Sequence, residues 1–507
     1  MSPIPLITRA EGYGDRTAVI ASEGAFTYAQ LLADSAAVAA CLLDGASDLD
    51  EARVAFLTPG GYHYVATQWG VWRAGGVTVP LATSHPKPEL AYMIEDSGAT
   101  IVIAHPQFED TLRELAEERG LRFLLTPDIL ETPPTASLPD VDPNRRAMII
   151  YTSGTTNRPK GVVSLHTTIE AQITSLVEAW GWTQDDHILH VLPLHHIHGI
   201  VNVLGCALWS GAVCDMLPAF DANAVWERIE RGGLTLFMAV PTIYARLVQA
   251  WNAAPPERQA AMTKACTQLR LMVSGSAALP VQTLEEWEDI SGHRLLERYG
   301  MTEIGMALSN PLNGERRPGY VGTPLPGVDL RLVDEDGHSA PEGSPGEIQV
   351  QGPAVFSEYW NKPEATASEF VDGWFKTGDV AVLEDGAYRI LGRSSVDIIK
   401  TGGFKVSALE VEDVLREHPD IAECAVVAMD DLEWGERVCA ALVLARNGAL
   451  TLQQLRDWSR ERLAPYKMPS RMIELTELPR NAMGKVVKPD LSKLFVEAEQ
   501  QTQPTAG

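Results

Sequence analysis

The stretch Tyr151-Thr-Ser-Gly-Thr-Thr-Asn-Arg-Pro-Lys-Gly161 follows directly on the apolar run Ala147 to Tyr151. The run predicts a buried strand. The loop after it offers hydroxyl groups, backbone N–H groups and one lysine, a set suited to cradling a triphosphate. A Walker A loop needs glycine at position 159 and serine or threonine at position 161, and the proline and glycine found there exclude it. An ordinary turn rich in serine, threonine and glycine is the other interpretation.

Strands and helices alternate on both sides of this loop. The strand-length runs are Arg53–Leu57, Thr100–Ala104, Leu234–Val240 and Leu269–Ser274, and the segments with helical period include Phe26–Leu43 and Asn223–Arg231. This alternation predicts an α/β fold whose mostly parallel sheets are covered by helices. From about Gly327, the Asp-Gly pairs at 336–337, 372–373 and 385–386 separate shorter runs and predict a β-rich subdomain.

The C-terminal part predicts a small α+β domain. Its expected elements are helices over Ala408–His418 and Leu452–Leu463 and strands over Ala425–Met429 and Arg437–Ala445, with a capping box at Thr451 and Gln454 and Pro465 ending the second helix. We therefore predict an N-terminal domain over 1–393, a mobile lid over 394–490 and a polar tail over 491–507. A hinge between Arg393 and Gly403 would place the active site between body and lid.

Composition narrows the class of protein. The 507 residues carry 41 Lys plus Arg against 67 Asp plus Glu, and the net charge of −26 argues against a nucleic-acid partner. The six cysteines show no C-x-x-C spacing, which predicts free thiols in a reducing compartment. The sequence has neither a secretory-signal pattern nor an apolar run of membrane-spanning length. We expect a cytoplasmic protein with no membrane partner; its oligomeric state stays open.

The loop resembles the phosphate loop of the adenylate-forming superfamily, which includes acyl-CoA synthetases, firefly-type luciferases and peptide-synthetase adenylation domains. Further segments resemble that superfamily's motifs in the same order, namely Gly300-Met-Thr-Glu303, Lys376-Thr-Gly-Asp379, Gly392-Arg393 and Pro479-Arg-Asn-Ala-Met-Gly-Lys485. The resemblance spans residues 10 to 490. It implies an AMP-forming acid–thiol ligase that uses ATP, Mg²⁺ and coenzyme A.

The resemblance also implies residue roles. It assigns Lys485 to the oxygen that bridges the carboxylate and the α-phosphate, and Glu303, beside Thr302, to Mg²⁺; Asp379 and Arg393 would bind the ribose. The other ATP contacts that it implies are Thr152, Ser153, Gly154, Thr155, Thr156, Lys160, Gly275, Ser276, Ala277, Tyr299, Gly300 and Met301. These roles agree with the chemistry, because two anions must meet and a hard cation prefers oxygen ligands.

The resemblance further places coenzyme A at Gly402, Gly403 and Phe404, since glycine lets the pantetheine approach the backbone. An ordinary turn before the helix at 408 is the alternative. The hinge segment Gly392-Arg-Ser-Ser-Val-Asp397 departs from the usual G-R-x-[KD]-[DE] pattern, which leaves Asp397 as the candidate pivot.

The acid substrate is suggested by two segments, 192–199 and 240–247, that resemble malonyl-CoA synthetases. Arg246 and Arg298 would supply permanently charged, bidentate partners for a second carboxylate, unless they form structural ion pairs. We expect His198 to line the acyl pocket. Met306 would either bound the space at the acid's second carbon or belong to the core.

These features predict ATP-dependent ligation of malonate to coenzyme A through malonyl-adenylate, with release of AMP and pyrophosphate. Methylmalonate or a short monocarboxylate is the alternative substrate. An adenylation domain that loads a separate carrier protein, or a protein that merely binds nucleotide, is the alternative of another class.

Overall fold

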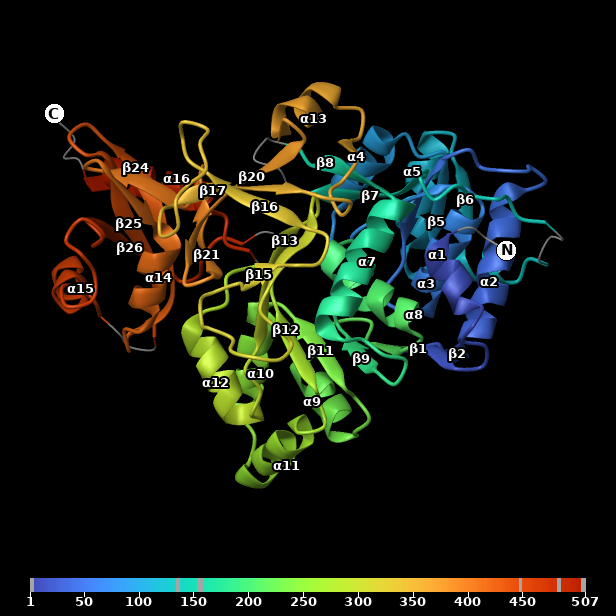
Figure 1. The fold of residues 1–507 in the computed structure, drawn as a ribbon, viewed down its shortest axis with the longest axis horizontal. Helices are drawn as coiled ribbons and strands as arrows, with labels where there is room; N and C mark the ends of the chain where they lie inside the picture. Colours follow the sequence, from blue (N-terminus) through green and yellow to red (C-terminus); the bar gives the residue numbers. More distant parts are fainter. Residues whose placement is uncertain (1–3, 134–136, 153–157, 446–448, 481–484, 503–507) are drawn as a thin grey trace.

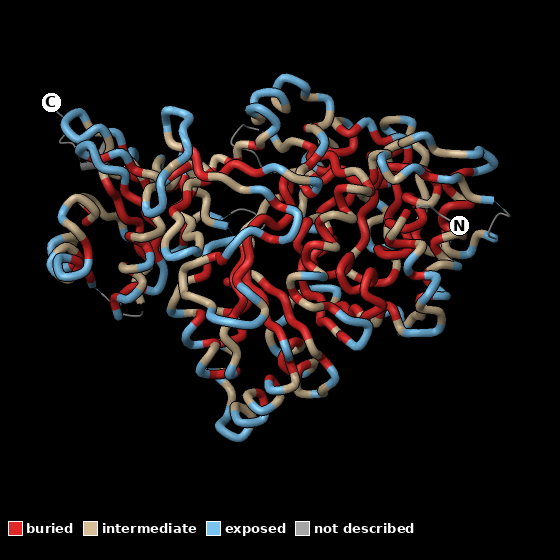
Figure 2. The backbone as a smooth tube through the Cα atoms, viewed as in Figure 1, coloured by how far each residue is buried: buried red, intermediate tan, exposed pale blue. Residues whose placement is uncertain are grey.

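The computed structural model describes residues 4–133, 137–152, 158–445, 449–480 and 485–502. Figure 1 shows a large body, coloured from blue through yellow to light orange, with a smaller domain in dark orange to red beside it. Figure 2 shows buried backbone concentrated in the sheets and exposed backbone along the outer helices and turns. The predicted α/β class, with a β-rich subdomain and a small C-terminal domain, is confirmed. Within the described ranges no helix is both long and apolar enough to cross a bilayer.

A seven-stranded sheet carries the predicted phosphate loop. Its order is β18 (Glu358–Tyr359), β8 (Lys160–Leu165), β7 (Arg146–Thr152), β4 (Val77–Pro80), β3 (Arg53–Leu57), β5 (Ile101–Ala104) and β6 (Arg122–Leu125). The core strands β4, β3, β5 and β6 are parallel, whereas β7 and β8 form an antiparallel hairpin. The segments next to this sheet are α2 (Tyr28–Leu43), α3 (Tyr62–Arg73), α4 (Lys87–Ser97), η1 (Pro106–Phe108), α5 (Glu109–Glu118) and α6 (Thr126–Leu130).

Alternation along β3 explains how helices cover both faces of this sheet. Val54 and Phe56 pack in the same core as α2 and α3, while Ala55 and Leu57 pack with α4 and α5. Successive side chains of a strand point to opposite faces, so a strand apolar at nearly every position requires a cover on each side.

A nine-stranded sheet completes the main body. Its order is β15 (Thr323–Pro324), β14 (Gly305–Ser309), β13 (Leu296–Met301), β12 (Leu271–Ser274), β11 (Leu236–Ala239), β9 (His187–His190), β10 (Val213–Met216), β1 (Thr17–Ala21) and β2 (Gly24–Thr27). The strands from β13 to β1 are parallel. The associated helices are α1 (Pro5–Ala10), α7 (His166–Trp180), the π-helix η2 (His198–Gly205), α8 (Cys206–Ser210), α9 (Ala222–Glu230), α10 (Pro241–Asn252), α11 (Pro256–Cys266) and α12 (Val281–Ser291).

The β-rich subdomain is antiparallel throughout. It comprises β16 (Asp329–Val333), β17 (Gly346–Gln351), β20 (Trp374–Glu384), β19 (Phe370–Val371) and β21 (Ala387–Arg393), with α13 (Pro363–Glu369) preceding β19. Two predicted Asp-Gly pairs form its hairpin turns, with φ of 50° and 81° at 372–373 and of 50° and 76° at 385–386. Positive φ at both central residues is the type I′ geometry that matches strand twist.

The C-terminal domain packs helices on both faces of one small sheet. The strands are β22 (Ile398–Thr401), β23 (Phe404–Ser407), β24 (Ile421–Asp431), β25 (Gly435–Leu444) and β26 (Arg471–Glu474). The core on one face contains α14 (Ala408–Arg416) and α15 (Leu452–Ser459), and the core on the other face contains α16 (Lys488–Thr502).

Three local expectations need correction. The helix expected from Phe26 begins at Tyr28, because Thr27 and Gln30 form a capping box there and Phe26 belongs to β2. Helix α15 ends at Ser459, so Pro465 does not end it.

The tail expected from residue 491 is also revised. Helix α16 crosses residue 490, and Leu491 and Phe495 are buried against the C-terminal sheet. Apolar residues four positions apart lie on one face of a helix, so helix α16 is part of the C-terminal domain.

Candidate active site

The predicted site residues gather where strands of the two large sheets end, beside the β-rich subdomain. Parallel strands place their carboxyl ends at one edge, where ligands of α/β proteins usually bind. Thr152 ends β7, Gly275 to Ala277 follow β12, and Tyr299 to Met301 end β13. Elements far apart in the sequence therefore contribute to one site.

The two stems of the predicted phosphate loop are paired strands. Thr152 at the end of β7 pairs in register with Lys160 at the start of β8. The Lys160 ammonium lies 4.6 Å from the centroid of the Tyr359 ring and 3.8 Å from a Glu369 carboxylate oxygen. The predicted contacts Ser153, Gly154, Thr155 and Thr156 lie outside the described residues.

The predicted ribose-binding residues contact one another. The Tyr299 hydroxyl donates to Asp379 Oδ2 at 2.6 Å, and Arg393 Nε lies 3.2 Å from Asp379 Oδ1. Asp379 is only 8% exposed, and burial raises the pKa of its carboxyl while Arg393 and Tyr299 oppose the rise. A buried carboxylate held between two donors can accept hydrogen bonds from a diol.

The predicted metal ligand Glu303 is buried next to Thr302. Its carboxylate accepts a hydrogen bond from the Tyr359 hydroxyl at 3.0 Å. Burial raises the pKa of Glu303, and Arg393 and Lys160 counteract this only in part. A buried carboxylate of this kind is stabilised by a cation, and Mg²⁺ prefers carboxylate and phosphate oxygens. The donor set therefore fits the metal.

Arg298 is buried in the body, with only 3% of its surface exposed. Its Nη2 lies 3.4 Å from Ser276 Oγ, which in turn lies 3.2 Å from His198 Nδ1. Arg298 Nε and His198 Nε2 are buried and have no hydrogen-bond partner among the described residues. Within that part of the chain no carboxylate forms an ion pair with Arg298. A buried guanidinium without a counter-ion calls for an anionic ligand.

The backbone around Arg298 is shaped to accommodate it. A Cβ on Gly275 would lie 2.6 Å from Arg298 Cζ, so a larger residue there would displace the guanidinium. Ser276 has a φ of +70°, a conformation that non-glycine residues adopt rarely and often at functional sites. Burial raises the pKa of the neighbouring Glu297 to about 8, and Glu297 accepts from the backbone N–H of Leu279 at 3.1 Å.

Of the other predicted acid-binding residues, Met306 lies at the site and Arg246 does not join it. Met306 is buried on β14, and a Cβ on Gly300 would lie 2.6 Å from its Cε. Arg246 is exposed on α10 and forms no hydrogen bond or ion pair with any residue that the structure describes. The two arginines expected to act together are thus in different environments.

Lys485, from the C-terminal domain, reaches the site on the body. The charges of Arg393, Arg298 and Asp379 all act on its ammonium group, although the residue as a whole is exposed. Loss of water around the ammonium lowers the pKa of Lys485, the two arginines lower it further, and Asp379 raises it. The lysine ammonium is therefore close enough to the ribose-binding residues and to the buried arginine to interact electrostatically with both.

The hinge segment and the glycine hairpin lie on the lid side. Asp397 Oδ2 accepts from the backbone N–H of Arg393 at 3.0 Å, and its Oδ1 lies 2.5 Å from Lys488 Nζ. Gly402 and Gly403 form the β22–β23 turn with φ of 56° and 83°.

Among the described contacts, the β22–β23 hairpin has none with Arg298 or Glu303. Lys400 and Lys405 on its two strands instead form ion pairs of 3.2 and 3.1 Å with Glu335, in the turn between β16 and β17. Phe404 at its tip is 50% exposed and stacks on Tyr466.

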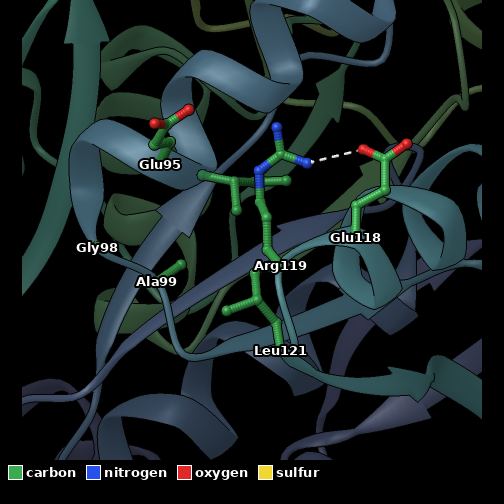
Figure 3. A pocket seen from close by; sticks show the side chains of 7 residues that line it. Glu95, Gly98, Ala99, Glu118, Arg119 and Leu121 are labelled. Atoms are coloured by element: carbon green, nitrogen blue, oxygen red, sulfur yellow. Dashed lines mark hydrogen bonds and ion pairs between the residues drawn. The ribbon is translucent and has the colours of Figure 1, made fainter.

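Sequence reasoning missed Tyr359, which donates to Glu303 and lies against Lys160. It stands outside every quoted motif, and only the pairing of β18 with β8 brings it to the site. A separate cavity at the C-terminal ends of α4 and α5, lined by residues such as Glu95 and Arg119, contains none of the predicted site residues (Figure 3).

The chain resembles known proteins over nearly all of its length. It matches the family model of the AMP-binding enzymes over residues 6–360 and that of the AMP-binding enzyme C-terminal domain over residues 410–485. The mitochondrial malonate–CoA ligase of Mus musculus is 47% identical to it, over 99% of this chain and 93% of the relative. The malonate–CoA ligase of Arabidopsis thaliana is 41% identical, over 96% of this chain and 87% of the relative.

Solved structures resemble this chain over nearly its whole length. ATP-bound MatB from Rhodopseudomonas palustris superposes with a TM-score of 0.90 at 34% identity, covering 98% of this chain and 100% of that one. The apo form of the same relative, with the same identity and coverage, gives a TM-score of 0.81. Identity and coverage are the same in the two comparisons, so the overall structure of this chain is more similar to the ATP-bound form than to the apo form.

Proposed function

The chain belongs to the AMP-binding enzyme family, and from this premise and its site we infer that it ligates malonate to coenzyme A. ATP and malonate form malonyl-adenylate and pyrophosphate, and the coenzyme A thiol then displaces AMP. The relatives named as malonate–CoA ligases, 41% and 47% identical, support this activity.

The observation that carries the choice of acid is the buried Arg298. Its guanidinium is enclosed beside His198 and Ser276 and has no described carboxylate partner, so a substrate bearing a second carboxylate would supply the missing counter-ion. Arginine suits this role because its fork of donors matches a carboxylate bidentately and stays charged. A fatty acid chain would leave the same charge buried and unpaired.

Adenylation requires the malonate carboxylate to attack the α-phosphorus of ATP while pyrophosphate leaves. Both reactants are anionic, so positioning and positive charge lower the barrier. Lys485 would hold the attacking oxygen and the α-phosphate together, while Thr152 and Lys160 at the loop stems would bind phosphate oxygens. Asp379, Tyr299 and Arg393 would hold the nucleoside.

Glu303 would hold Mg²⁺, with the Thr302 hydroxyl beside it. A bound magnesium ion would supply charge neutralisation to the phosphates. The Tyr359 hydroxyl orients the Glu303 carboxylate by donating to it at 3.0 Å. The remaining predicted contacts, Gly275, Ala277, Gly300 and Met301, would shape the nucleotide site through their backbone.

Thioester formation needs a different lid position. In the arrangement described, Lys485 is at the site and the hairpin of Gly402, Gly403 and Phe404 lies against Glu335. We propose that the lid, beginning at residue 394, rotates about Asp397 after adenylation, withdraws Lys485 and presents the hairpin to coenzyme A. The family's alternative, loading of a separate carrier protein, would use the same rotation.

The free cysteine thiols support a proposal for the cellular compartment. All six cysteines are free, and five of them are buried. Such thiols persist in a reducing compartment, and we propose the cytoplasm. The mouse relative is named as mitochondrial, so fractionation of the source cell decides between them.

The test is coenzyme A-dependent AMP release measured side by side with malonate, methylmalonate, succinate, acetate and octanoate. A preference for malonate supports the proposal. A preference for methylmalonate would change the acid but retain the pocket around Arg298, because methylmalonate also carries a second carboxylate. Activity led by acetate or octanoate would refute the role of Arg298, and adenylate formation without transfer to coenzyme A would favour a carrier protein as acceptor.

A further inference from the structure

Helix α4 contacts both stems of the phosphate loop. The hydroxyl of Tyr151, the residue before Thr152 on β7, donates to Asp96 Oδ2 at 2.8 Å. On the other stem, the Tyr92 hydroxyl donates to the carbonyl of Pro159 at 2.9 Å, immediately before Lys160. The single proton of this hydroxyl is shared with Asp96 Oδ1, which lies 3.2 Å from the Tyr92 oxygen. One carboxylate therefore connects to both sides of the loop.

A third contact joins this carboxylate to the strand that holds Tyr359. Lys362 Nζ lies 3.5 Å from Asp96 Oδ1. Lys362 closes a turn with Tyr359, whose hydroxyl donates to Glu303. Asp96 thus contacts Tyr151 on β7 and Lys362 after β18 directly, and it is linked to Pro159, just before β8, through Tyr92.

The position of Asp96 within its helix does not favour a carboxylate. Asp96 is in the last turn of α4, where the partial negative charge of the helix end disfavours an acidic side chain. Burial and the hydrogen bond with Asp96 both raise the pKa of Tyr151, which keeps the phenol a neutral donor. The adjacent Glu95 is exposed and faces the cavity of Figure 3 instead.

We propose that Asp96 is a positioning residue that holds the two stems of the phosphate loop in register, and thereby sets the affinity for the β- and γ-phosphates of ATP. The proposal rests on the proposed function, because it takes the loop after Thr152 as the triphosphate site. It acts through Tyr151 and Tyr92 and needs no contact between Asp96 and the nucleotide.

The test compares equilibrium binding of ATP and AMP by titration calorimetry in the full-length protein and in Asp96→Asn, Tyr151→Phe and Glu95→Gln. Only ATP carries the phosphates that the loop would hold, so AMP reports on the intactness of the nucleoside site. Glu95→Gln removes the same charge from the same helix turn without touching the loop stems. Asp96→Asn should weaken ATP binding by about tenfold and AMP binding by less than about twofold, as expected for loss of a charge-assisted hydrogen bond.

Tyr151→Phe removes a single hydroxyl and should weaken ATP binding in the same direction. The double variant should lose less than the sum of the two single effects, because both changes break one interaction. An unchanged ATP affinity in Asp96→Asn, an equal loss of AMP and ATP, or an equal effect of Glu95→Gln would each overturn the proposal. If the unaltered protein binds ATP no more tightly than AMP, the assignment of the loop itself fails instead.

Discussion

Replacing Arg298 with methionine should separate activity from stability. In the free protein the buried guanidinium has one long hydrogen bond, 3.4 Å to Ser276, and its Nε has no described partner. Removing the guanidinium therefore removes the cost of burying an unpaired charge. We expect the Arg298→Met substitution, which introduces an apolar side chain of similar length, to raise the free energy of unfolding by about 1 kcal/mol. Most core substitutions have the opposite sign.

The effect on malonate is expected to be large. Loss of a buried, charge-assisted pair with the distal carboxylate should remove about 3 kcal/mol of transition-state binding, which corresponds to about 150-fold in kcat/KM for malonate. The KM for ATP should change little, because the nucleoside contacts at Asp379 are separate. Monocarboxylates such as propionate should lose less than malonate or improve.

The assay is pyrophosphate release with malonate or ATP varied in turn, together with calorimetric unfolding of the ligand-free protein. Arg246→Met is the matched control, since Arg246 was predicted for the same role but is exposed on α10. An unchanged malonate kcat/KM in Arg298→Met would refute the pocket. A comparable loss in Arg246→Met would show that both arginines bind the acid, and a strong destabilisation by Arg298→Met would show that its charge is compensated in the fold.

Other variants test the remaining roles. Lys485→Ala should slow adenylation by about 10³-fold while thioester formation from supplied malonyl-adenylate is far less affected; equal losses in both half-reactions would refute its use in the first step alone. Adenylation should fall at alkaline pH as Lys485, whose pKa is lowered, loses its proton, and at acid pH as Glu303, whose pKa is raised, gains one; Lys485→Arg should move the alkaline limb upward in a pH–rate profile. Met306→Ala should increase the ratio of methylmalonate to malonate kcat/KM, and an unaltered ratio would place Met306 in the core alone.

Local signals made much of the fold predictable. The buried runs of β3 and β12, the Asp-Gly turns at 372 and 385, and the capping box at Thr451 depend on neighbours within a few residues, and each was found close to its predicted place. The roles of Asp379, Glu303 and Lys485 were predicted only from their resemblance to known motifs. No local rule distinguishes a functional carboxylate or lysine from an ordinary one.

Only the tertiary structure decided which charged side chains are buried and which distant residues come into contact. Arg246 and Arg298 are chemically identical in the sequence, yet one is exposed and the other is 3% exposed. Tyr359 meets Glu303, and Asp96 meets Tyr151, across separations of more than fifty residues. Spacing along a chain determines periodicity and turns, whereas burial and long-range contact arise when sheets and domains pack, so the functions of these groups depend on the fold.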